Sequence, residues 1–167
     1  MKARMTFIRN VTRYWLPVIF WTCFIFWIST KTFSSQHTSL LVEKILFLLF
    51  PGISSQQAEM VNFFLRRTGH VTGYFILGIL LFRAFRSGSA ASWNWRWFWG
   101  AFIVVVLWAI MDEFHQSLVP TRTASLVDVG IDTAGGTLAQ LVCALWHGYR
   151  KNQRGNSISK DNTRTSL

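Results

Sequence analysis

Residues 97–118 read WFWGAFIVVVLWAIMDEFHQSL, and this stretch decides the fold. It carries no charge as far as Met111, and as an α-helix it is long enough to cross the hydrocarbon core of a bilayer, which takes about 20 residues. Its far end carries Asp112, Glu113 and His115. Ionisable groups are costly inside a membrane, so they are rare there unless they have a role. The stretch therefore predicts a transmembrane helix with a polar site near one end.

Three further stretches have the length and apolar character of a membrane span, residues 14–30, 68–85 and 124–149. The chain is 51% hydrophobic and 14% charged, and what lies between the spans is too short to bury a separate soluble core. A shorter apolar segment, residues 38–50, is followed by a Pro-Gly pair. We expect a one-domain, all-α integral membrane protein with about four transmembrane helices and a short interfacial or re-entrant helix in the first outer loop.

The positive charges predict how the chain is oriented. The net charge is +10, yet the basic residues alternate between the two sides of the spans and do not form one patch of the kind that binds nucleic acid. Twelve of the 17 Lys and Arg residues lie on the side of both termini, which the positive-inside rule places in the cytoplasm. We expect a multi-pass protein of the bacterial cytoplasmic membrane, with a basic cytoplasmic head at residues 1–13, a disordered cytoplasmic tail at 148–167 and no nucleic-acid partner.

Polar residues recur at helical spacing in three of the predicted spans, so each of these helices has a polar stripe. Four of the seven acidic residues fall in or at the ends of the third and fourth spans. A rise of about 1.5 Å per residue brings the stripes to a similar depth, in the outer half of the bilayer. The sequence thus predicts one polar pocket that opens to the extracytoplasmic face. The stripes are His70 and Tyr74 in the second span, Asp112, His115 and Gln116 in the third, and Asp128, Asp132, Gly136 and Gln140 in the fourth.

An enzyme acting on an amphiphilic envelope molecule is one function that fits such a pocket. His115 or His70 would be the general base, and Glu113 or Asp112 would orient it or act as the acid. Arg122 would hold a phosphate or carboxylate by bidentate hydrogen bonds. No GxSxG, HExxH or P-loop motif identifies the reaction, so catalysis itself stays open.

Binding without turnover needs no nucleophile, and here Arg122 and the Arg66-Arg67 pair would grip an anionic headgroup. A small proton-coupled transporter would instead use Asp132 and His70 as relay groups. A purely structural polar network between helices is the remaining alternative. The candidate substrate-binding residues are Arg67, Tyr74, Gln116, Arg122, Asp128 and Asp132, and the candidate catalytic residues are His70, Asp112, Glu113 and His115.

A divalent metal is a further alternative. Asp112 and His115 stand one turn apart, and with His70 and either Asp128 or Asp132 they would form a mixed nitrogen and oxygen ligand set that suits Zn²⁺ or Mn²⁺. No single helix carries a complete ligand motif, so the sequence assigns no metal-binding residue and leaves the cofactor open.

Two segments of the chain resemble parts of a known family. The segment MDEFHQ at residues 111–116, with the Pro, Arg, Asp and Gly residues that follow it, resembles the signature of the VanZ-like family. The segment RRTGH at residues 66–70 is similar to that family's basic-x-x-His-x-x-x-Tyr pattern. Two positions depart from the family, since Asp132 stands where many members carry Asn and Arg67 where Lys is frequent. The resemblance covers most of residues 14–147, which we expect to form a VanZ-like transmembrane domain.

The family is named for a protein that raises resistance to the glycopeptide teicoplanin. The resemblance therefore implies a role at the cell envelope and a contribution to antibiotic resistance. The partners it implies are membrane lipids and either a lipid-linked cell-wall precursor or a glycopeptide. The oligomeric state is not implied.

Overall fold

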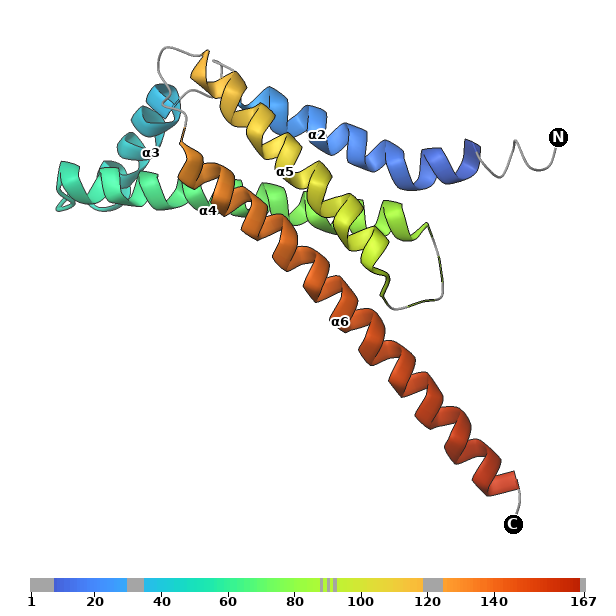
Figure 1. Ribbon diagram of the computed structural model, residues 1–167. Coiled ribbons are helices and arrows are strands. Elements are labelled where there is room, and N and C mark those ends of the chain that lie inside the picture. Colours follow the sequence, from blue (N-terminus) through green and yellow to red (C-terminus); the bar gives the residue numbers. More distant parts are fainter. Residues whose placement is uncertain are drawn as a thin grey trace.

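The computed structural model describes residues 8–29, 35–87, 89, 91, 93–118 and 125–165, and within these ranges the regular structure is helical, with no strand. Helix α4 (Ser55–Arg86) is the central element, because each of the other helical elements packs against it. Figure 1 shows the arrangement. The elements are η1, a π-helical segment (Val11–Trp15), followed by α2 (Leu16–Ile28), α3 (Ser35–Leu49), α4 (Ser55–Arg86), α5 (Trp95–Ser117) and α6 (Leu126–Thr165).

Four helical stretches among the described residues are long and apolar enough to cross a membrane, which confirms the predicted number of spans. Large apolar side chains on their surfaces face outward, with Leu145 74% exposed and Phe20 70% exposed. A water-soluble protein rarely exposes so much apolar surface, whereas a lipid bilayer covers it. The chain is therefore a multi-pass membrane protein, and the cytoplasmic location of its termini stays a prediction. The four stretches are Ile8–Ile28, Ser55–Arg86, Trp95–Ser117 and Leu126–Gln153.

The second span begins earlier than residue 68, where its apolar run starts. Helix α4 starts at Ser55 because Ser54 and Gln57 form a capping box, in which the Gln57 backbone N–H donates to Ser54 Oγ (3.3 Å) and the Ser54 backbone N–H donates to Gln57 Oε1 (3.0 Å). The preceding helix, α3, occupies the segment for which an interfacial helix is predicted and packs against α4. Its position relative to the bilayer stays a prediction.

The described C-terminal residues up to Thr165 belong to helix α6. Helix α6 continues without interruption to Thr165, and its second half projects away from the other helices (Figure 1). No proline interrupts the sequence between Leu126 and Thr165, and Lys and Arg residues recur along its second half. Positive charge near the C-terminal end of a helix interacts favourably with the helix dipole. The disorder expected of residues 148–167 stays a prediction.

Small residues let α4, α5 and α6 approach closely. A Cβ added at Gly78 would lie 2.3 Å from the carbonyl oxygen of Gly136, and one added at Gly136 would lie 2.8 Å from Val105 of α5. The contact face of α4 is not the Gly69 and Gly73 pair that a small-xxx-small pattern suggests, because a Cβ at either position would meet no atom within 4 Å. The register of the bundle is therefore set at Gly78.

Helix α2 is joined to α4 by a hydrogen bond between a side chain and the backbone. The indole N–H of Trp21 donates to the carbonyl oxygen of Gly73 at 2.9 Å. We expect Trp21→Phe, which keeps an aromatic ring but removes the donor, to lower the free energy of unfolding by about 0.5–1.5 kcal/mol. Thermal unfolding of the purified protein in detergent would measure this loss. An unchanged midpoint would show that the bond contributes nothing to the docking of α2.

Candidate functional site

Three helices bring ionisable side chains to one point. His70 of α4, Asp112 of α5 and Asp132 of α6 each offer one nitrogen or oxygen atom, and these atoms lie within 4.8 Å of one another. Asp132 is 0% exposed and Asp112 is 3% exposed. The Nδ1 atom of His70 lies 3.3 Å from Oδ2 of Asp132. One residue from each polar stripe thus enters a shared buried cluster.

The spacing of the core residues explains why Asp112 points inward. On α5 the buried positions Val105, Ala109, Asp112 and Gln116 recur every three or four residues and form one face of the helix. The side-chain amide of Gln116 donates to Oδ2 of Asp112 at 3.0 Å, which orients the carboxylate. Asp112 therefore continues the apolar contact face of α5, and only its polarity differs from that of the residues before it.

Several buried polar atoms in this region have no hydrogen-bond partner in the described part of the chain. They include Oδ1 of Asp112, Oδ1 of Asp132 and the hydroxyl of Tyr74, which is 1% exposed. Both side-chain polar atoms of Gln140, eight residues after Asp132 on α6, are also unpartnered. Buried polar groups are normally hydrogen-bonded, so each exception calls for an explanation. Among the described residues the exceptions all lie on α4, α5 and α6, most of them on the polar stripes, with Arg67 Nε and Glu113 Oε1 beside these.

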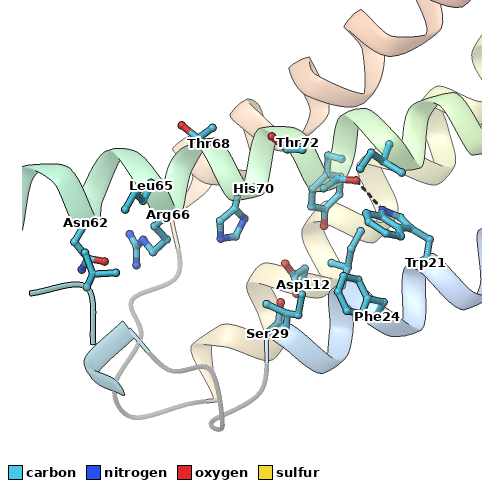
Figure 2. Close-up of a pocket in the computed structure, with 17 residues that line it drawn as sticks. Trp21, Phe24, Ser29, Asn62, Leu65, Arg66, Thr68, His70, Thr72 and Asp112 are labelled. Carbon is cyan, nitrogen blue, oxygen red and sulfur yellow. Dashed lines mark hydrogen bonds between the residues drawn. The ribbon is translucent and has the colours of Figure 1, made fainter. Parts of the chain in front are cut away.

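A cavity of about 520 Å³ lies beside this cluster, between α2, α3, α4 and α5. Its lining joins an apolar wall to a polar one. In Figure 2, Arg66 and His70 extend from the same side of α4, and His70 points toward Asp112 of α5. Phe24 of α2, Ser29 directly after it and Asp112 line the same cavity (Figure 2). The apolar part of the lining includes Trp21, Phe24, Ile25, Ile28, Val42, Leu65 and Ile76.

The two neighbouring arginines of α4 have different surroundings. Arg67, a predicted substrate-binding residue, lies 3.5 Å from Oδ1 of Asp128 and places its guanidinium 4.6 Å from the centre of the Phe63 ring. Arg66, not Arg67, lines the cavity. Spacing by four residues puts Arg66 on the same face of α4 as His70, so the stripe could have been extended backward to find it. Arg67 and Asp128 instead join α4 to α6.

Two candidate catalytic residues lie outside the cluster and the cavity lining. Oε2 of Glu113 accepts a hydrogen bond from the backbone N–H of Ser125 at 2.8 Å, which ties the end of α5 to the start of α6. The ring of His115 packs against Phe26 of α2 with ring centres 4.3 Å apart. His70 and Asp112 therefore remain as the candidates that face the cavity, whereas Arg122 lies outside the described residues.

The cavity wall supplied by α2 was not predicted from the sequence. Trp21, Phe24 and Ser29 come from the first span, which carries no Asp, Glu, His, Lys or Arg between Tyr14 and Ser29 and so showed no polar stripe. An apolar span gives no sign of which of its faces meets a pocket and which meets lipid.

Comparison with known proteins gives one family. No curated protein matches the chain, and no solved structure does. A family model described as VanZ/LLP1 matches residues 14–147, which include most of the first span, the second and third spans whole, the fourth span up to His147, and every residue of the buried cluster. On that match, the chain belongs to the VanZ/LLP1 family.

Proposed function

We propose that this protein binds an amphiphilic cell-envelope molecule in the cavity between α2, α3, α4 and α5, and thereby contributes to glycopeptide resistance at the bacterial plasma membrane. The observation that carries the proposal is the two-part lining of the cavity. Its apolar wall includes Trp21 and Phe24, and its polar wall includes Arg66, His70 and Asp112. A ligand that matches both walls has an apolar chain and a polar, charged head.

The basic groups of the cavity favour an anionic headgroup. Arginine holds phosphate through paired hydrogen bonds, and Arg66 is free of the ion pair that occupies its neighbour Arg67. An acyl or prenyl chain would lie against the aromatic and aliphatic side chains of α2. Lipid-linked cell-wall precursors and phospholipids have this combination of groups. The predicted orientation places the cavity toward the outer leaflet, where glycopeptides meet their targets.

Chemical modification of the bound molecule is a second candidate function. The contact between His70 Nδ1 and Asp132 Oδ2 at 3.3 Å favours it, because a carboxylate that fixes one ring nitrogen leaves the other available as a general base. His70 also lines the cavity, where it would meet a ligand. Release of a product from the bound molecule, followed by mass spectrometry, would distinguish turnover from binding alone.

Binding of a polyprenyl phosphate tests the proposal directly. Native mass spectrometry of the detergent-solubilised protein should show a bound polyprenyl phosphate. Arg66→Ala should weaken this binding roughly ten- to hundredfold, since a hydrogen bond to a charged group is worth about 1.5–3 kcal/mol. The uncharged polyprenyl alcohol should bind wild type and Arg66→Ala alike.

The matched control is Arg67→Ala, which removes the same charge from the adjacent position but acts outside the cavity. It should leave phosphate binding close to that of wild type. Equal losses in Arg66→Ala and Arg67→Ala would mean that the protein attracts phosphate through its general positive charge, and the proposed headgroup site would then be wrong.

A further inference from the structure

The buried cluster of His70, Asp112 and Asp132 has an unbalanced charge. Within the described residues, neither Asp112 nor Asp132 has a Lys or Arg at ion-pair distance. A single imidazole, even when protonated, neutralises only one of two ionised carboxylates. Like charges held close together in a medium of low dielectric constant repel strongly, and a membrane span supplies little water to screen them. With both carboxylates ionised, the cluster needs one more positive charge to be neutral, and either a proton or a bound cation supplies it.

Each of the two carboxylates also has one oxygen atom that accepts no hydrogen bond from the described residues. Asp112 uses Oδ2 to accept from Gln116, and Asp132 directs Oδ2 to His70, while Oδ1 of each residue has no hydrogen-bond partner among the described residues. The unpartnered hydroxyl of Tyr74 lies one helical turn beyond His70 and lines the same cavity. Asp112, Asp132 and Tyr74 are each 97% buried or more. Buried oxygen atoms whose lone pairs meet neither water nor a described protein donor are available to coordinate a cation.

The distances among the three ligand atoms are compatible with binding to one shared metal ion. Nitrogen and carboxylate ligands bind Zn²⁺ at about 2.0–2.2 Å, so two ligands of a tetrahedral ion lie about 3.3–3.6 Å apart. The atoms of His70, Asp112 and Asp132 lie within 4.8 Å of one another, so side-chain movements of roughly 1 Å, on the order of the difference between these separations, would bring them around one ion. One imidazole with two carboxylates suits Zn²⁺ or Mn²⁺ better than Ca²⁺ or Mg²⁺, which prefer oxygen ligands alone.

We propose that His70, Asp112 and Asp132 bind one divalent metal ion of the Zn²⁺ or Mn²⁺ class. Three protein ligands leave a coordination position open, as in catalytic rather than structural zinc sites. Because His70 and Asp112 also line the cavity, that open position faces it. The metal site stands apart from the proposed lipid binding, since it is tested with the metal alone.

The test is metal stoichiometry in the full chain. The detergent-solubilised protein, purified without a His tag, is stripped with a chelator, equilibrated with Zn²⁺ or Mn²⁺ alone and passed over a desalting column. Elemental analysis should find close to one ion per wild-type chain. Asp132→Asn and His70→Ala should weaken the affinity, measured against a competing chelator, by at least about tenfold.

Asp128→Asn is the matched control, because it removes a carboxylate one turn earlier on α6 that belongs to the ion pair with Arg67. It should retain the wild-type metal content. A wild-type chain that binds no more metal than a buffer blank overturns the proposal. So does a loss in Asp128→Asn as large as that in Asp132→Asn, because that would be a general effect of removing acidic charge.

A second measurement needs no substitution, which matters because Asp132→Asn also breaks the buried contact with His70. Ligands that bind only the folded state raise its thermal stability. Zn²⁺ or Mn²⁺ should raise the unfolding midpoint of stripped wild-type protein by several degrees, and Mg²⁺ should raise it less. No shift with either metal would contradict the site. Lipid binding is measured separately, so failure of the metal site and failure of the proposed function are distinguishable.

Discussion

Gly78→Ala should prevent the chain from accumulating in its folded form. The added Cβ would lie 2.3 Å from the Gly136 carbonyl oxygen and 2.9 Å from Cβ of Ala139, so the backbones of α4 and α6 would have to separate. Overpacking commonly costs about 1–3 kcal/mol, and a clash with backbone on both helices should reach or exceed the upper end. Membrane levels and the thermal midpoint in detergent would both fall.

Gly69→Ala provides the control on the same helix. A Cβ at Gly69 would meet no atom within 4 Å, and alanine is a better helix former than glycine. This variant should accumulate at least as well as wild type. If Gly78→Ala were tolerated as well as Gly69→Ala, the close packing of α4 on α6, and with it the approach of His70 to Asp132, would be in error.

His70→Ala should abolish glycopeptide resistance, whereas His115→Ala should retain most of it. His70 lines the cavity and contacts Asp132, while His115 packs on Phe26 away from both. The measurement is teicoplanin susceptibility of a sensitive Gram-positive host that expresses wild type or either variant. Quantified membrane levels separate loss of function from loss of protein.

Two outcomes would contradict this expectation. Loss of resistance in His115→Ala alone, at normal membrane levels, would move the functional site to the end of α5 near Phe26. Resistance unchanged in both variants, or absent in wild type, would mean that the proposed role in resistance does not apply to this chain. Only a selective effect of His70→Ala supports the cavity as the functional site.

The number of spans was predictable from the sequence, because length and apolar composition decide it. The helix boundaries were less predictable from the sequence. Helix α4 begins at Ser55, before its apolar run, because a capping box and not hydropathy sets its start. Helix α6 continues past Tyr149 through a polar segment that contains no proline. Hydropathy predicts where a helix enters a membrane but not where the helix itself begins or ends.

The polar helix faces that form the candidate site were predictable from the sequence, but which side chains meet there was not. Spacing by four residues put His70, Asp112 and Asp132 on the right helices. It placed Asp112 on the polar stripe of the third span but left open whether Asp112 or Glu113 acts at the site, because that depends on how α5 is rotated. The rotation follows from packing of Val105 against Gly136, a contact between residues far apart in the sequence. Local periodicity carries no information about such a contact.

Helix α6 is 40 residues long, and at about 1.5 Å per residue it measures roughly 60 Å, against about 30 Å for the hydrocarbon core of a bilayer. A membrane therefore covers only about half of it. The second half of α6 projects away from the other helices (Figure 1). A continuous helix of this length would hold a protein fused to its end at a defined distance from the lipid headgroups, whereas a flexible linker would allow a range of distances. The C-terminus is therefore a suitable place for a distance reporter.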